Sequence, residues 1–170
     1  QVISFADGVL TAQWNVPGDA EVEGWNVRLY NGKKYDETVT VTDMIGREVT
    51  VKPGSYKRVV CIGAGALRMY SYIGDVALLV GVEDIDNTTL AERPMMFDSV
   101  ARPYVLAYGD VFSQLPSCGV GGPMAQAAEA EKILSCNPDI VISEFEDVDK
   151  SNALQQQLGV PVITLKAGPK

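Results

Sequence analysis

The chain has 170 residues, room for one ordinary domain and a short extra segment. Charged residues make up 21% and hydrophobic residues 46%, a globular composition, while a net charge of −8 disfavours nucleic-acid binding because no basic stripe would face the phosphates. Histidine is absent, which excludes serine–histidine and cysteine–histidine hydrolases and histidine-ligated zinc sites. No apolar run reaches the roughly 18 residues of a membrane helix, and no basic start precedes an apolar core.

The first 36 residues predict a β-rich amino-terminal segment, separate from an α/β domain over residues 37–170. Residues 9–14 and 25–30 alternate between apolar and polar side chains as strands do. Pro17-Gly18 and Asn31-Gly32 are typical of turns. The segment is either a small β appendage or part of a larger β domain, and its strands resemble those of a fibronectin-type sandwich.

A β-hairpin is expected next, with strands over residues 38–42 and 47–51. The connection, residues 43–46, begins with Asp43 and ends with Gly46, the residues that a type I turn with a glycine bulge favours. We expect the alternating valines of the hairpin to lie against the edge of the main domain.

Residues 59–74 form the centre of the predicted domain. The run Val-Val-Cys-Ile at 59–62 predicts a strand buried on both faces. Gly63 and Gly65 allow a sharp turn into a helix that Gly74 ends. The expected buried face of that helix, at helical spacing, is Ala66, Met69, Tyr70 and Ile73.

The rest of the chain continues an alternation of strands and helices. A long connection, residues 85–116, carries no helical or strand periodicity. Connections of this length usually have a functional role. The order predicts a three-layer αβα fold with a parallel sheet of about five strands. The remaining elements are expected as strands at 77–82, 117–120, 139–143 and 160–165, and as helices from 121–123 to Asn137-Pro138 and over 151–158.

Part of a dinucleotide-binding fingerprint is present. Gly63 and Gly65 follow the first buried strand, and Glu83 lies twenty residues further on at the end of the next one. Arg68 stands where the third glycine normally lets the helix pack closely on the strand. A dinucleotide-dependent oxidoreductase that uses these residues is therefore an alternative hypothesis.

Four carboxylates, Glu144, Glu146, Asp147 and Asp149, follow the fourth strand of the domain. They allow three interpretations: a hard-cation site, a solvated loop and helix start, or a docking contact for a basic partner. The three cysteines, Cys61, Cys118 and Cys136, form no CxxC pair and are expected to be small buried hydrophobic residues.

Arginines and tyrosines gather near the predicted strand ends. A cation in the first turn of a helix, such as Arg68, is opposed by the helix dipole, so it awaits an acid or an anionic ligand, or is simply solvated. Arg102, Tyr104 and Tyr108 lie in the long connection. Such residues could line a cleft for a large, flat or anionic ligand.

At this point the sequence resembles a known family. Residues 40–51 and 57–63, the run Gly119-Val120-Gly121-Gly122-Pro123, and the later stretches 131–142 and 158–162 are similar to the substrate-binding proteins of ABC importers. The branch is the one that takes up ferric siderophores, haem and cobalamin. The resemblance runs from about Thr38 to Leu165 in unbroken order.

The resemblance implies two α/β lobes joined by a long helix, with the ligand between them, and this chain supplying the amino-terminal lobe without the second. It implies that the turn from Gly63, the segment from Arg102 and the loop from Glu144 face the cleft. The implied ligand contacts are Gly63, Ala64, Gly65, Arg68, Arg102, Tyr104 and Tyr108. Asp147 or Asp149 would dock on a membrane permease. The expected function is capture of a chelated metal, most of all a ferric siderophore, by a protein that is not an enzyme and has no cofactor and no free-metal site. The expected location is extracytoplasmic, periplasmic or as a cell-surface lipoprotein, with the signal segment outside this chain.

Overall fold

A computed structural model describes residues 2–6, 9–13, 38–94, 102–122 and 125–166 of the chain. The chain divides into two compact units, Gln1–Lys33 and Lys34–Lys170. In the first unit, β1 (Val2–Ala6) pairs antiparallel with β2 (Val9–Gln13). The predicted strand at 9–14 is therefore present and gains a partner that the sequence did not indicate. The strand predicted at 25–30, both predicted turns and the boundary at residue 36 lie outside the described residues.

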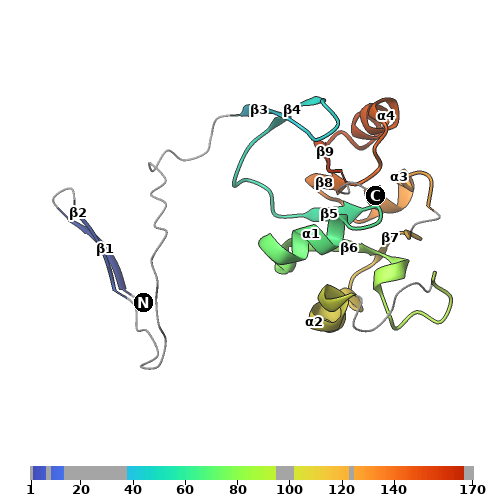
Figure 1. The fold of residues 1–170 in the computed structure, drawn as a ribbon, viewed down its shortest axis with the longest axis horizontal. Helices are drawn as coiled ribbons and strands as arrows, with labels where there is room; N and C mark the ends of the chain where they lie inside the picture. The colour runs from blue at the N-terminus through green and yellow to red at the C-terminus, as the bar shows by residue number, and fades with distance from the viewer. Residues whose placement is uncertain (1, 7–8, 14–37, 95–101, 123–124, 167–170) are drawn as a thin grey trace. The chain divides into compact units, whose positions relative to one another are not determined.

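The second unit contains a five-stranded parallel sheet in the order β7-β6-β5-β8-β9 (Figure 1). β5 is the central strand, and all four of its residues are buried. The predicted parallel sheet is confirmed. Its strands are β5 (Val59–Ile62), β6 (Leu79–Glu83), β7 (Ser117–Gly119), β8 (Ile140–Ser143) and β9 (Val162–Thr164).

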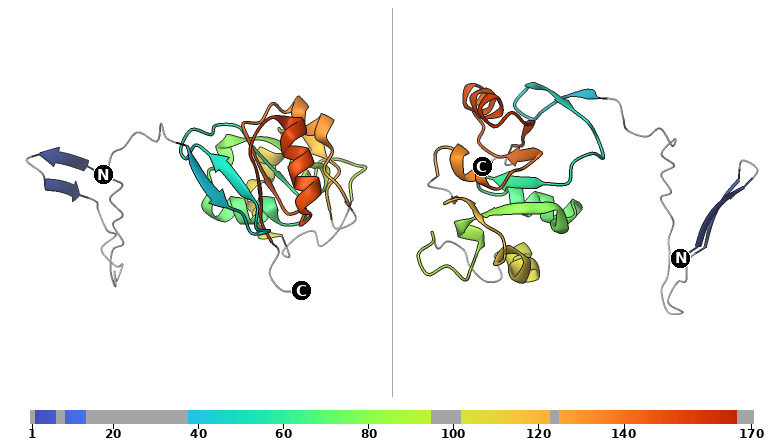
Figure 2. Two further views of the ribbon diagram at one scale, coloured as in Figure 1. Left: turned by 90° about the horizontal axis from the view of Figure 1, so that it is seen from above. Right: turned by 180° about the vertical axis from the view of Figure 1, so that it is seen from behind.

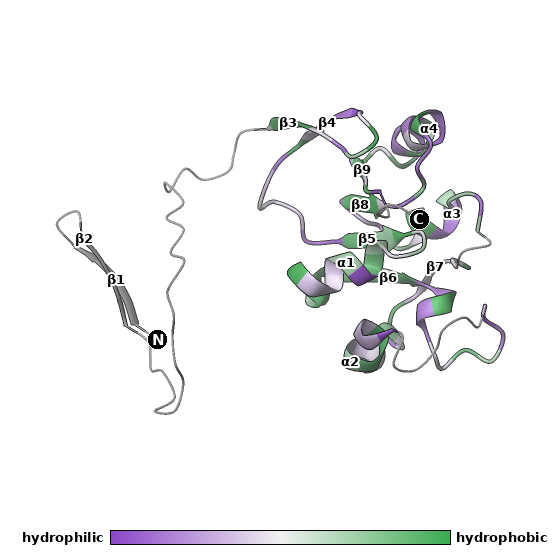
Figure 3. Cartoon of the chain, in the orientation of Figure 1, coloured by the Kyte–Doolittle hydropathy of each residue, from purple (hydrophilic) through white to green (hydrophobic). Residues whose placement is uncertain are grey.

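Helices cover both faces of this sheet, which confirms the three-layer αβα architecture (Figure 2). Alternate residues of a strand point to opposite faces, so Val59 and Cys61 pack with α1 and α2, whereas Val60 and Ile62 pack with α3 and α4. The strands β5 and β8 accordingly have the hydrophobic colour in Figure 3. The α-helices are α1 (Ala66–Ile73), α2 (Pro103–Phe112), α3 (Ala130–Ser135) and α4 (Val148–Leu158), with 3₁₀ turns η1 (Val76–Leu78) and η2 (Asp84–Asp86).

The prediction for the buried face of α1 was partly wrong. Ala66 is buried as expected, but the other buried residues are Leu67 and Ser71, and Ile73 is 91% exposed. The Ser71 hydroxyl donates to the Leu67 carbonyl, 2.7 Å away, and so needs no solvent. The turn at Gly65 sets the rotation of the helix, and a pattern of apolar residues alone does not reveal that rotation.

The prediction of an irregular connection before β7 was also wrong, because α2 lies within it. Pro103 occupies the first turn of α2, where its missing N–H costs nothing. Tyr104, Tyr108 and Phe112 recur every fourth residue, and Phe112 is fully buried. The helical spacing was therefore present in the sequence.

Two further helix boundaries differ from expectation. α3 begins at Ala130 and not at the predicted 121–123, where Gly121 and Gly122 have φ values of 70° and 84° that no right-handed helix accommodates. Within α3, Ile133 is buried and Leu134 is 43% exposed. α4 begins at Val148, earlier than predicted, and ends before Gly159 as expected. None of the helices within the described ranges is long and apolar enough to cross a membrane.

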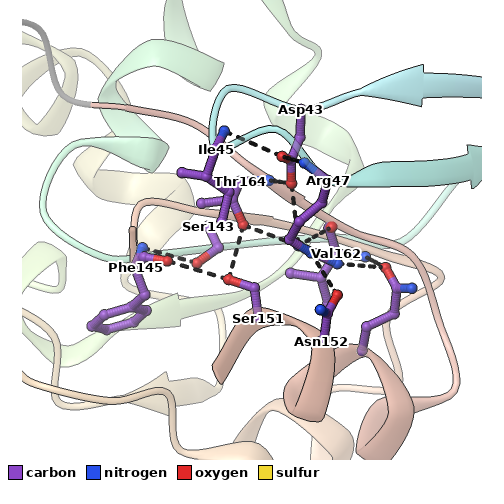
Figure 4. A network of polar contacts seen from close by, with 10 residues as sticks. Asp43, Ile45, Arg47, Ser143, Phe145, Ser151, Asn152, Val162 and Thr164 are labelled. Atoms are coloured by element: carbon purple, nitrogen blue, oxygen red, sulfur yellow. Dashed lines mark hydrogen bonds and ion pairs between the residues drawn. The ribbon is translucent and has the colours of Figure 1, made fainter. Parts of the chain in front are cut away.

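The hairpin of β3 (Val39–Thr42) and β4 (Glu48–Val51) forms as predicted. Val49 and Val51 are buried. The hairpin is held by a polar network centred on Arg47, in which each guanidinium nitrogen donates a hydrogen bond (Figure 4). Its acceptors are side chains of Asp43, Asn152, Gln155 and Thr164 and the Val162 carbonyl.

Candidate ligand site at the strand ends

The strand order changes direction between β5 and β8. The chain adds β6 and β7 on one side of β5 and then returns to add β8 and β9 on the other. In open α/β sheets, ligands bind beyond the carboxyl ends of the strands at such a switch point. Here two segments meet there: the turn Gly63-Ala64-Gly65 after β5, and the loop that begins with Glu144 after β8.

The glycine turn has a shape that only glycine adopts readily. Gly63 and Gly65 have φ values of 89° and 131°, and the Gly65 N–H donates to the Gly63 carbonyl at 2.8 Å. A Cβ atom on Gly65 would lie 2.9 Å from both carboxylate oxygens of Glu144. The glycines thus permit both the turn and the close approach of Glu144.

Glu144 is held against this turn with an unsatisfied acceptor. Its backbone N–H donates to the Ile62 carbonyl at 3.0 Å, which fixes the residue beside β5. Its Oε1 atom is buried and has no hydrogen-bond partner among the described residues. Burial raises the pKa of Glu144, an effect that nearby Arg68 opposes and Glu146 increases. Arg68 itself is exposed, on the first turn of α1.

A second carboxylate connects the loops that follow β5, β6 and β7. Glu83, which is 5% exposed, accepts a hydrogen bond from the Gly63 N–H at 3.0 Å. On its other side, a Cβ atom on Gly121 would lie 2.6 Å from the Glu83 Cβ. Burial raises the pKa of Glu83 to about 7; the Gly63 hydrogen bond opposes the shift, and the charges of Asp86, Glu129 and Asp84 add to it.

Arg102 and Tyr104 are brought together by Asp86. The buried Arg102 guanidinium forms an ion pair with Asp86, and the Tyr104 hydroxyl donates to the same carboxylate at 2.8 Å. Burial raises the pKa of Asp86 although Arg102 opposes the shift. Tyr108 is half-buried and packs on Phe112, with ring centroids 6.2 Å apart. These contacts fasten α2 to η2, and the ligand role predicted for the three residues stays a prediction.

This geometry disfavours the dinucleotide alternative. The Glu83 carboxylate is buried against Gly63, so it is not placed to reach a ribose hydroxyl. The Glu144 carboxylate lies against Gly65, where a pyrophosphate would need to approach the backbone. The Glu144 carboxylate beside the glycine turn would also repel an anionic pyrophosphate.

The other acids after β8 point to the surface. Glu146, Asp147 and Asp149 are exposed, and Asp147 caps α4 by accepting from the Lys150 N–H at 2.9 Å. No group of three or more metal-ligating side chains occurs among the residues that the structure describes. The three cysteines are buried and free, and Cys61 and Cys118 lie in strands as predicted.

A small cavity lies between α3, α4 and the end of β8. It has a volume of about 170 Å³, and its lining includes Ala130, Ser143, Phe145, Lys150 and Leu154. Pockets for drug-sized ligands are typically about 300–1,000 Å³. This cavity is therefore too small for a metal chelate.

Comparison with solved structures identifies the fold. A periplasmic solute-binding protein from Veillonella parvula matches 78% of this chain with a TM-score of 0.53 and 18% identity. The Helicobacter pylori protein CeuE, solved as a nickel–histidine complex, matches 77% with a TM-score of 0.51 and 16% identity. The chain has the fold of periplasmic solute-binding proteins. It spans 36% and 37% of the lengths of these two proteins.

The catecholate-siderophore binding protein VctP from Vibrio cholerae matches 75% of this chain and 37% of its own, with a TM-score of 0.48 and 25% identity. No protein-family model matches the sequence, and no curated protein does.

The resemblance places both the glycine turn and the loop that begins at Glu144 in the cleft, but the residues alone do not separate Glu144 from the three acids that follow it. The residue was grouped with three other acids because they are close in the sequence. Its distinguishing feature is that it directly follows β8, the strand beside β5, and this adjacency comes from the sheet order alone.

Proposed function

We propose that residues 37–170 are the amino-terminal lobe of an ABC-importer substrate-binding protein that captures a chelated metal, most of all a ferric siderophore, and delivers it to a membrane permease. The supporting observation is a glycine turn at the switch point of a sheet whose fold is shared with periplasmic solute-binding proteins. Binding and release need no catalytic group, so the protein acts as a receptor and not as an enzyme. Its location is extracytoplasmic.

The proposed ligand surface is the turn Gly63-Ala64-Gly65 with Arg68 at its rim. Arg68 is exposed and can donate to ligand oxygens. Tyr108 offers apolar ring area to the ligand. Arg102 and Tyr104, which are held together by their shared contact with Asp86, are the other proposed ligand contacts. Asp147 and Asp149, exposed at the start of α4, are the proposed docking acids for the permease.

Titration of the two-lobe protein tests this function. Ferric siderophores, haem and cobalamin are added separately while tyrosine and tryptophan fluorescence is recorded, and at least one should bind with a Kd below about 10 μM, a free energy near −7 kcal/mol. Arg68→Gln should weaken that binding. Lys57→Gln is the matched control, because Lys57 is exposed at the opposite end of β5. Absence of binding to every compound contradicts the uptake function.

The alternative function, a dinucleotide-dependent oxidoreductase, retains one supporting observation. With β5 counted as the first strand, the sheet order 3-2-1-4-5 is that of dinucleotide-binding folds. A saturating ligand raises the melting temperature of the protein that binds it. A rise in the melting temperature with NAD or NADP, and none with the metal chelates, would favour the enzyme.

A further inference from the structure

We propose that Glu144 determines which charge of ligand this lobe accepts, by selecting metal chelates that present a positive charge or a hydrogen-bond donor to the Gly63–Gly65 turn. The inference rests on the proposed function and adds to it a ligand class and a specificity-determining residue. It predicts weaker binding of polyanionic chelates, which the arginines near the strand ends would favour if considered alone.

The first observation is the unsatisfied oxygen of Glu144. A buried acceptor without a partner costs free energy, which is recovered when a donor reaches it. The carboxylate lies at the glycine turn, within 2.9 Å of the position that a Cβ atom on Gly65 would take. A ligand group that contacts this turn therefore lies beside the Glu144 carboxylate.

The second observation is the balance of charge at the strand ends. Arg102 is already paired with Asp86, so its positive charge is locally compensated. Arg68 acts on Glu144 electrostatically, but no hydrogen bond or ion pair joins them in the described part of the chain. Glu146 is also near Glu144, but it is exposed, so solvent screens its charge. A polyanionic ligand at the turn would place negative oxygens beside the Glu144 carboxylate, which repels them at close range.

These observations favour a hydroxamate-type chelate over a catecholate-type one. A ferric trihydroxamate offers carbonyl and hydroxamate oxygens that Arg68 can bind, and its amide N–H groups or a pendant ammonium can donate to Glu144. A ferric tricatecholate is polyanionic and places oxygens where Glu144 would need a donor. Charge-assisted hydrogen bonds are the stronger ones, so a pendant ammonium gives the largest preference.

The test compares three chelates on the two-lobe protein: ferrioxamine B, which carries an ammonium group, its N-acetylated form, which lacks that charge, and ferric enterobactin, a polyanionic tricatecholate. Ferrioxamine B should bind at least about tenfold more tightly than ferric enterobactin. Glu144→Gln should reduce the affinity for ferrioxamine B about tenfold and have a smaller effect on the acetylated form. Glu146→Gln is the matched control, because it removes the same charge from an exposed position, and should change each Kd less than about twofold.

The outcomes separate this inference from the function on which it rests. If a chelate binds but ferric enterobactin is preferred, or if Glu144→Gln and Glu146→Gln have equal effects, Glu144 does not select the ligand and the uptake function still holds. If no chelate binds, both fail. Circular dichroism tests whether Glu144→Gln is folded. If the variant does not fold, the wild-type protein alone decides: equal affinity for ferrioxamine B and its acetylated form would overturn the inference.

Discussion

Two polar clusters of the α/β unit differ in how completely their groups are paired. Around Arg47, the guanidinium and the buried Asp43 carboxylate are both satisfied by hydrogen bonds, which join the hairpin to β9 and α4. At the strand ends, Glu83 is buried with a pKa of about 7, and Glu144 keeps an unpartnered oxygen. The paired cluster fastens the scaffold, whereas the incompletely paired one lies at the strand ends, where open α/β sheets in general bind ligands.

The largest expected effect comes from breaking the paired cluster. Arg47→Leu removes every hydrogen-bond donor of the guanidinium. It also leaves the buried Asp43 carboxylate without the positive charge that pairs with it. We expect the free energy of unfolding to fall by about 3–5 kcal/mol, the cost of leaving a buried charge unpaired. Urea unfolding measures it.

Arg68→Leu is the matched control for this experiment. It makes the same substitution at an exposed position and should change the free energy of unfolding by no more than about 0.5 kcal/mol. Equal losses in the two variants would show that the Arg47 network is not an anchor.

The next effect concerns the strand-end cluster and depends on pH. The fold raises the pKa of Glu83 from 4.5 to about 7, so the folded state favours the protonated carboxyl. Stability from this group is therefore complete below pH 4.5 and is lost as the pH rises through about 7. We expect this group to lower the free energy of unfolding by up to about 3 kcal/mol between pH 4.5 and 8.

Glu83→Gln should remove this contribution, because the amide is neutral throughout and can still accept from the Gly63 N–H. Its unfolding free energy, measured by urea titration at several pH values, should therefore decline less with pH than that of the wild type. Glu131→Gln, an exposed carboxylate, serves as the control. The same decline in both variants would place the titrating group elsewhere.

Much of the scaffold could be predicted from the sequence because local patterns determine it. The β-branched run at β5 is hydrophobic on both faces, as a central parallel strand must be. The hairpin followed from its turn, in which Asp43 accepts from the N–H groups of Ile45 and Arg47. The rotation of α1 could not be predicted in the same way, since it depends on how Gly65 directs the helix onto the sheet.

The site was less predictable because its contacts join distant parts of the chain. Arg102 was expected to face a ligand, but its partner Asp86 lies in η2, sixteen residues earlier, and no local pattern links them. The dinucleotide alternative uses Glu83 because of its spacing from the glycines, which is correct for a strand end but says nothing about where its carboxylate points. Only the packing of Gly63 and Gly121 around it gives that direction.

The smallest expected effect separates structure from function within the acidic loop. Asp147 caps α4, and Asp149, in the first turn of the same helix, makes no comparable contact in the described residues. Asp147→Ala should lower the free energy of unfolding by about 1 kcal/mol, the usual value of a helix cap, and Asp149→Ala by less than about 0.5 kcal/mol. Thermal unfolding measures both. If Asp149→Ala weakens binding to the permease while the stability of the variant is unchanged, Asp147 holds the helix and Asp149 docks the partner. If only Asp147→Ala weakens binding, in proportion to its lost stability, the loop contributes a helix cap and no docking contact.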